Sequence, residues 1–227
     1  MPLKTEDQTR NFSLLIGDIN GKDLLRDWSL WLLLAINLAT MFWALIAHWN
    51  LLAIMWVYWF QSIEIGWFNF LRIIELKEFS VEGFTINDRP AKNTEGTKYF
   101  TAIFFAFHYG FFHFGYAHFL LSDGFGKRFG GAPTTQEMNS ILITAALFFV
   151  AHLFSYFYNK PNDTKKQNIG KLMGYPYARI IPMHFTIIFG SMVGALPLFL
   201  VLKTCADCYM HVYEHNVLRK GEAPALR

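Results

Sequence analysis

Charged residues are scarce in this chain of 227 residues, since Asp, Glu, Lys and Arg make up 16% of it, against roughly 25% in soluble domains. Hydrophobic residues make up 53%, and the stretch from Trp28 to Trp49 contains no Asp, Glu, Lys or Arg. That stretch is longer than the ~20 residues that a helix needs to cross a bilayer. The scarcity of charge therefore argues against a soluble globular domain and predicts an integral membrane protein.

Cysteine is almost absent, since Cys205 and Cys208 are the only two in the chain. Two cysteines inside one apolar stretch do not make a disulfide framework. The formal net charge of +3 comes from basic residues scattered through loops, so no nucleic acid partner is expected. The partner that the composition predicts is the lipid bilayer, with a lipid-like molecule as the candidate substrate; the sequence sets no oligomeric state.

Apolar stretches predict six transmembrane helices, at 28–48, 51–72, 99–121, 139–159, 179–194 and 196–217. The last two come from one run that is too long for a single crossing, and Gly190, Gly194 and Pro197 divide it. The predicted fold is an all-α, polytopic helical bundle. Its parts are an N-terminal tail (1–27), a six-span membrane domain (28–217) and a C-terminal tail (218–227).

The distribution of Lys and Arg predicts the orientation of these spans. With six spans, the loops and tails on one side hold nearly all of the basic residues, whereas the other side holds only Lys127 and Arg128. Basic residues are in excess on the cytoplasmic side of membrane proteins. The sequence therefore predicts a multi-pass protein of the cell membrane with both termini in the cytoplasm.

The predicted last span carries a row of polar side chains. Asp207, His211 and His215 are each four residues apart, so a helix places them along one stripe. Lipid cannot solvate such a stripe at membrane depth, and it must face protein or an internal cavity. We therefore expect the stripe to form one wall of a buried site.

Counting 1.5 Å per residue from the cytoplasmic end of each span places further polar groups in one layer about 6 Å thick. The layer holds Glu64, His108, His152, His184, Asp207 and His211, with His215 at its rim. Neutral imidazole is the usual nitrogen ligand of transition metals. The sequence thus predicts a metal site, with zinc favoured over iron, copper or haem. The predicted ligands are His108, His152, His184, His211 and His215.

The first functional hypothesis is a zinc-dependent intramembrane hydrolase of a lipid-like substrate. Three histidines would hold the metal and leave a fourth position for water. Zinc lowers the pKa of its water toward 7, and a catalytic carboxylate, Glu64 or Asp207, would take the proton. One alternative is a redox protein with iron, copper or haem. The other is a metal-ion or proton transporter, in which the same layer is the ion path.

Each polar group also has a simpler interpretation. Asp207 could pair with Lys203 one helical turn earlier. Glu64 could be protonated and bonded to Gln61 or Asn69, because a charged carboxylate at that depth is costly. A single buried histidine often bonds to a backbone carbonyl group or a tyrosine.

The histidines of 99–121 are five residues apart, so His108, His113 and His118 do not share one helix face. The roles of His113 and His118 stay open between an outer-site ligand, a proton relay and polar groups of an aromatic belt.

Four segments resemble an uncharacterised family of multi-span prokaryotic membrane proteins, classed as a domain of unknown function. They are YWFQSIEIGWFNFLRI, FFAFHYGFFHFGYAHFLL, PYARIIPMHFTIIFG and LKTCADCYMHVYEH. The resemblance covers the second to the sixth predicted span and implies a helical membrane domain, but no activity. The last-span pair His211 and His215 is similar to the HxxxH of membrane ceramidases and adiponectin-receptor-like proteins, which implies zinc.

Overall fold

The computed structural model describes residues 25–124, 131–163, 166–177, 180 and 196–220. This part of the chain is mostly helical, as predicted. Its long helices are α3 (Trp28–Ile46), α4 (Leu51–Glu75), α5 (Glu95–Leu121), α7 (Thr135–Asp163) and α9 (Leu196–Lys220). By length and composition α3, α4 and residues Thr135–Pro161 of α7 could each cross a membrane. The predicted fifth span, 179–194, lies outside the described residues except for Ile180.

Polar side chains at the helix starts explain where the helices begin. The side chains of Asp27, Asn50 and Thr94 accept hydrogen bonds from backbone N–H groups in the first turns of α3, α4 and α5. Before α7, Glu137 N donates to Thr134 Oγ1 and Thr134 N donates to Glu137 Oε2. This reciprocal capping satisfies N–H groups that have no partner inside the helix.

Two short strand pairs depart from the all-α prediction. The strands are β1 (Phe79–Ser80), β2 (Thr85–Ile86), β3 (Arg89–Pro90) and β4 (Gln167–Asn168). β1 pairs with β4 in parallel and β2 pairs with β3 antiparallel. Asn87 and Asp88 turn the β2–β3 hairpin with φ of 50° and 60°, a conformation that Asn and Asp tolerate. Strands of two residues are too short to show a hydrophobic period, although the polar loop 73–98 is long enough for a small hairpin or an interfacial helix.

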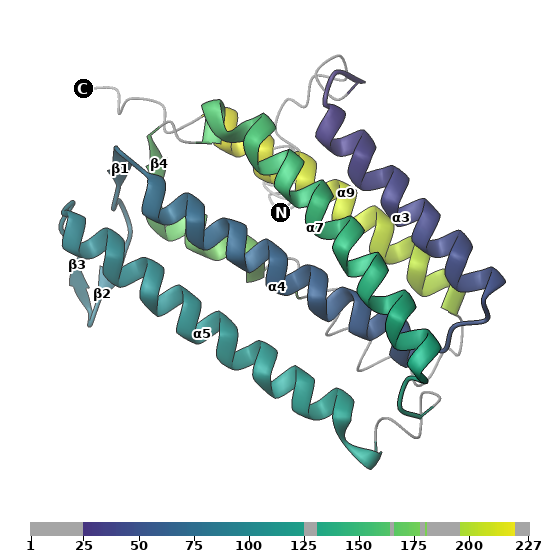
Figure 1. Cartoon of the computed structure of the whole chain (residues 1–227). Coiled ribbons are helices and arrows are strands. Elements are labelled where there is room, and N and C mark those ends of the chain that lie inside the picture. Colours follow the sequence, from purple (N-terminus) through teal and green to yellow (C-terminus); the bar gives the residue numbers. More distant parts are fainter. Residues whose placement is uncertain (1–24, 125–130, 164–165, 178–179, 181–195, 221–227) are drawn as a thin grey trace, which may run out of the picture.

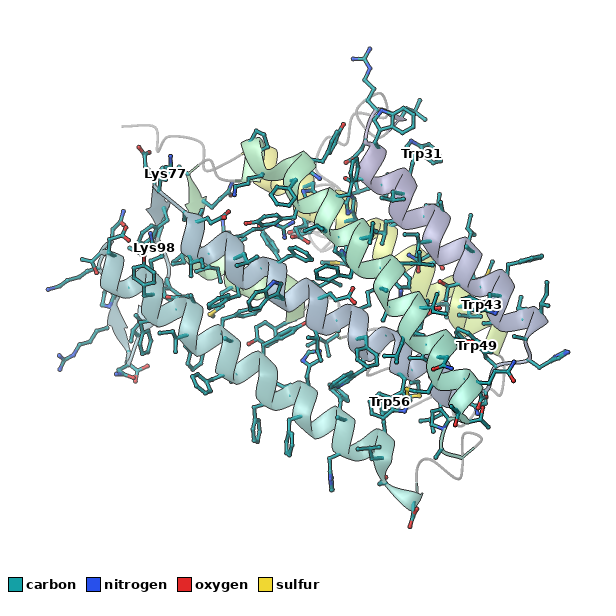
Figure 2. The ribbon with its side chains drawn as sticks, viewed as in Figure 1. Trp31, Trp43, Trp49, Trp56, Lys77 and Lys98 are labelled. Atoms are coloured by element: carbon teal, nitrogen blue, oxygen red, sulfur yellow. The ribbon has the colours of Figure 1, made fainter. Side chains whose placement is uncertain are left out.

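The long helices form a bundle (Figure 1). α5 packs on α4, α4 packs on α7, and α3, α7 and α9 pack on one another. Figure 2 shows Trp43, Trp49 and Trp56 toward one end of the bundle and Lys77 and Lys98 at the other. We call these ends the tryptophan end and the lysine end.

Two apolar clusters hold the helices together. The first fills the tryptophan end with residues from the last part of α3, the start of α4 and the facing turns of α7 and α9; it includes Ala44, Leu52, Val57, Phe148 and Leu200. The second joins α5 and the end of α4 to the segment after β4; it includes Ile73, Phe105, Tyr109, Ile169 and Leu172. In the region between the two clusters, α3, α4, α7 and α9 enclose side chains that are mostly polar.

Gly66 allows α5 to approach α4 closely. A Cβ atom on Gly66 would lie 2.4 Å from Cε1 of the Tyr109 ring, which is closer than real contacts allow. We expect Gly66→Ala to lower the free energy of unfolding by about 1–3 kcal/mol through overpacking. Reversible unfolding in detergent would measure the change. Gly110→Ala on α5 is the control, because a Cβ atom there has no neighbour within 4 Å and alanine favours a helix. Equal stabilities of the two variants would contradict this prediction.

Candidate functional site

Buried polar side chains lie between α3, α4, α7 and α9, in the part of the bundle that begins at the start of α3. We call them the polar network: Asp27, Ser29, Asn37, Gln61, Arg72, His152, Ser155, Asn159, Lys203, Asp207, His211, Glu214 and His215. Each of them is at least nine-tenths buried. Each of the five members on α9 has another member three or four residues away, so they share the face of α9 that meets the other helices.

Lys203 is the centre of the inner part of the network. Its Nζ donates to Asn37 Oδ1 at 3.0 Å and to Gln61 Oε1 at 2.5 Å. It also forms a 2.5 Å ion pair with Asp207 Oδ2, which accepts a second hydrogen bond from Gln61 Nε2 at 3.0 Å. The ring of Tyr58 covers the ammonium group at 3.9 Å. The simpler interpretation of Asp207, pairing with Lys203, is therefore confirmed.

His211 joins the network to the start of α3. Its Nε2 lies 3.1 Å from Ser29 Oγ and 3.8 Å from Asp27 Oδ2. Ser29 Oγ donates its one proton to Asp27 Oδ1 at 2.5 Å and accepts from Asn159 Nδ2 at 3.0 Å. Because the hydroxyl proton is already used, the hydrogen bond between Ser29 and His211 requires a proton on Nε2 of the imidazole.

The carboxyl group of Asp27 is ionised in this arrangement. Burial by itself would raise its pKa, but the nearby imidazole of His211 and the hydrogen bonds from Ser29 outweigh burial and hold the pKa well below its usual value. A fixed negative charge therefore lies beside His211, immediately before the first residue of α3.

A small cavity lies between α4, α7 and α9, next to His211. Its volume is about 20 Å³, enough for one water molecule. The lining residues are Ile65, Phe68, Arg72, His152, Ser155, His211, Glu214 and His215. Arg72 Nη1 and Glu214 Oε1 form an ion pair of 2.6 Å, and the rings of His211 and His215 are 4.5 Å apart. The cavity thus brings together two opposite charges and three imidazoles.

The prediction of a metalloprotein is wrong. Among the residues that the structure describes, no group of three or more His, Cys, Asp or Glu side chains could hold a metal ion. The reason is that Asp207 and His211 are engaged with Lys203, Gln61 and Ser29 instead of converging on one point. The zinc hydrolase, redox and transport functions depended on the same site and are not supported. His184, one of the predicted ligands, lies outside the described residues.

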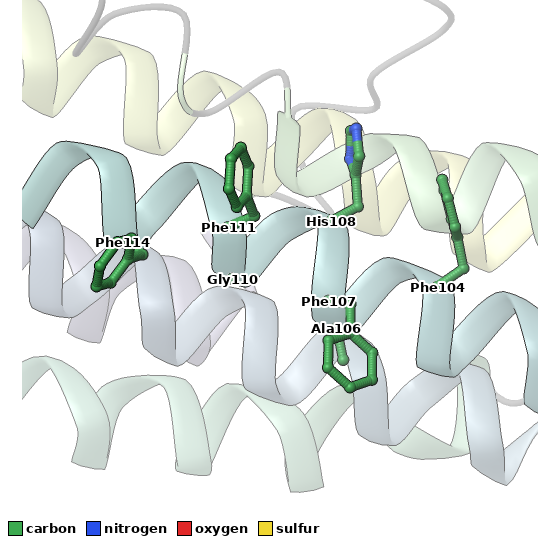
Figure 3. Close-up of a pocket in the computed structure, with 7 residues that line it drawn as sticks. All are labelled: Phe104, Ala106, Phe107, His108, Gly110, Phe111 and Phe114. Carbon is green, nitrogen blue, oxygen red and sulfur yellow. The ribbon is translucent and has the colours of Figure 1, made fainter.

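His108 does not face the polar network. It lies on the exposed side of α5, and its Nδ1 is 2.7 Å from Tyr177 Oη. It lines a shallow groove of about 590 Å³ in which Phe104, His108 and Phe111 point to one side of α5 (Figure 3). Glu64 is half-buried and belongs to no hydrogen bond of the network, so the two predicted catalytic carboxylates, Glu64 and Asp207, have different surroundings.

His113 takes part in a separate contact between α4 and α5. Its Nε2 lies 2.9 Å from Ser62 Oγ, and its Nδ1 lies 2.8 Å from the backbone oxygen of Tyr109. The Tyr109 hydroxyl is 2.8 Å from Ser62 Oγ. These bonds satisfy a buried imidazole between two packed helices, whereas His118 is exposed.

Asp27, Ser29 and Arg72 were not predicted as members of a site, whereas helical spacing places Glu214 on the polar stripe of the last span. An Asp directly before an apolar run is a helix-start signal, and it could have identified Asp27 as a cap. Nothing in the spacing of Arg72 and Glu214 indicates that they pair, because 142 residues separate them and they meet only in the folded bundle.

Comparisons with known proteins assign no activity to this arrangement. A family model matches residues 22–223, and its description is a family of unknown function. This confirms the resemblance to an uncharacterised family, whereas nothing supports a prokaryotic origin or the similarity to membrane ceramidases. No curated protein and no solved structure matches the chain.

Proposed function

Because the chain belongs to DUF6498, a family to which no function is assigned, we propose a function from the geometry alone. We infer that the chain is a multi-pass protein of the cell membrane that binds protons in its polar network. It has six spans and both termini in the cytoplasm, and the network opens toward the cytoplasmic side. The three apolar helices α3, α4 and α7 support the membrane location.

The orientation is supported by charge. The lysine end holds Lys77 and Lys98 (Figure 2), and basic residues are retained on the cytoplasmic side of membranes. Asp27 and Arg72 lie at the ends of α3 and α4 that face the same way, since the two helices are joined by a short turn. The first apolar cluster occupies the opposite end of the described bundle, so protons would enter and leave from the cytoplasmic side.

His211 carries the proposal, since its imidazole is buried against an ionised carboxylate 3.8 Å away. Histidine is the side chain whose charge ordinarily changes between about pH 5 and 8. The charged or titratable groups that face its surroundings come from every helix packed there: Asp27 before α3, Arg72 on α4, His152 on α7, and Glu214 and His215 on α9. A proton taken up by His211 would therefore alter the electrostatics of the whole cavity.

A purely structural role explains the network less well. Replacing buried ion pairs by apolar residues of similar volume is often neutral or stabilising. Ionisable groups within a membrane are costly, and they mark ion pathways or proton relays. The two buried ion pairs, Lys203–Asp207 and Arg72–Glu214, enclose His211 from both sides along α9. We infer that they keep the cavity polar enough to accept a charged imidazole.

Histidine NMR of the purified protein in detergent tests the proposal. We expect one ring signal to titrate between about pH 5 and 8 and to disappear in His211→Gln. Asp27→Asn should move the midpoint of that titration, whereas His118→Gln, which changes an exposed histidine of α5, should leave it unchanged. A His211 signal that stays constant over this range would contradict the proposal.

The pH dependence of stability separates Asp27 from the histidines. The pKa of Asp27 is lowered in the folded protein, so its contribution is complete above the unfolded pKa of 3.8 and is lost as the pH falls below it. The stability difference between wild type and Asp27→Asn should therefore shrink as the pH falls below about 4. Asp27 stays ionised between about pH 5 and 8, so a change of this difference in that range reports the shifted titration of His211.

A further inference from the structure

Glu64 is an ionisable residue that the polar network does not use. It lies one residue beyond the middle of α4, a helix of 25 residues that is long and apolar enough to cross the membrane. The middle of such a helix lies near the centre of the bilayer. The neighbouring side chains Ile63 and Trp67 are exposed, and the side chain of Glu64 is half-buried.

One oxygen of this carboxyl group receives no hydrogen bond within the part of the chain that the structure describes. Glu64 Oε2 is buried, and no donor from the described residues reaches it. The cation that acts on it electrostatically is Lys203. An ammonium group has three N–H donors, and Lys203 directs hydrogen bonds to Asn37, Gln61 and Asp207. Lys203 is therefore committed to the network and does not bond to Glu64.

The two amides that could bond to Glu64 are also engaged elsewhere. Gln61 Nε2 donates to Asp207 Oδ2 at 3.0 Å, and Asn69 Nδ2 donates to the backbone oxygen of Leu172 at 3.1 Å. A carboxylate at membrane depth without hydrogen-bond donors is strongly disfavoured, whereas a neutral carboxylic acid is not. The neutral acid also has an O–H group of its own.

From this placement we propose that Glu64 is a proton-carrying carboxylic acid at the centre of the membrane. It would be a second proton-binding group of the protein, near the inner part of the polar network around Lys203. The proton is the ligand, bound as the O–H of the carboxyl group. The proposal extends the proposed function and shares with it the membrane location, but it does not depend on His211. Glu64 differs from Asp207 in its hydrogen-bond donors, since Asp207 Oδ2 accepts from Lys203 and Gln61.

Infrared spectroscopy of the full chain in detergent tests the protonation state directly. A protonated carboxylic acid has a carbonyl-stretch band that a carboxylate lacks. We expect this band at neutral pH in the wild type, and its loss in Glu64→Gln, which keeps the size of the side chain. Glu137→Gln is the matched control and should leave the band unchanged, because Glu137 accepts hydrogen bonds from Thr134 and Asn50. Identical spectra of wild type and Glu64→Gln in this region would overturn the proposal.

Reaction with a hydrophobic carbodiimide is the second measurement. The O–H of a protonated carboxyl group adds across one C=N bond of the reagent, so the peptide that contains Glu64 gains the mass of one reagent molecule. We expect this adduct in the wild type and its loss in Glu64→Gln. Protection by sodium ions would show that a monovalent cation, and not a proton, occupies the carboxyl group, and would also overturn the proposal. A failure of the His211 titration leaves both results unaffected, so the two proposals are tested separately.

Discussion

Replacing Lys203 by Met should destabilise the protein by about 3–5 kcal/mol, because the substitution leaves the Asp207 carboxylate buried without its cation. The side chains of both partners are about nine-tenths buried, so solvent cannot replace the lost interaction. The same substitution removes the donor that Asn37 and Gln61 share. The free energy of unfolding in detergent, from reversible denaturant titration, is the measurement.

A double variant separates the ion pair from the packing of the lysine chain. Lys203→Met with Asp207→Asn should recover a large part of the lost stability, because no charge is then left unpaired. Lys77→Met is the control, since Lys77 is exposed and its replacement should change the stability by less than about 0.5 kcal/mol. A Lys203→Met variant as stable as Lys77→Met would contradict the buried ion pair.

Replacing Arg72 by Met should also cost about 3–5 kcal/mol, for the same reason at the other end of the network. Arg72 and Glu214 form an ion pair of 2.6 Å between α4 and α9, and their side chains are 9% and 5% exposed. Removing the guanidinium group leaves Glu214 beside the cavity without its cation. Reversible unfolding, with the histidine NMR spectrum as a second readout, measures the effect on stability and on the cavity.

The control for this variant is Lys160→Met, which removes an ion pair that also links two helices but lies near the surface. Lys160 Nζ and Glu75 Oε1 link α7 to α4 at 2.9 Å, but both side chains are more than one-third exposed. Lys160→Met should cost no more than about 1 kcal/mol, because solvent screens exposed pairs. If Arg72→Met and Lys160→Met cost the same, the Arg72–Glu214 pair does not behave as a buried one.

The candidate site was only partly predictable from the sequence. The spacing of Asp207, His211 and His215 identified the inward face of α9, and depth counting placed His152 and His211 in one layer. Both methods locate groups along a helix and around it. Neither can distinguish side chains that converge on a metal from side chains that bond to Asn, Gln, Ser and Lys. That is why the metal site was wrong while the buried polar face of α9 was correct.

By itself, the sequence predicted the membrane class and the positions of the long described helices, because these depend on composition and on spacing within one helix. It offered the pairing of Asp207 with Lys203 as an alternative to a catalytic role. Only the tertiary structure decided that Asp27 and Ser29 meet His211, that Arg72 meets Glu214, and that His108 faces outward. Periodicity fixes the face of a helix on which a residue lies, but it does not fix which helix covers that face. The partners of His211 come from a different helix, and only packing brings them within hydrogen-bonding distance.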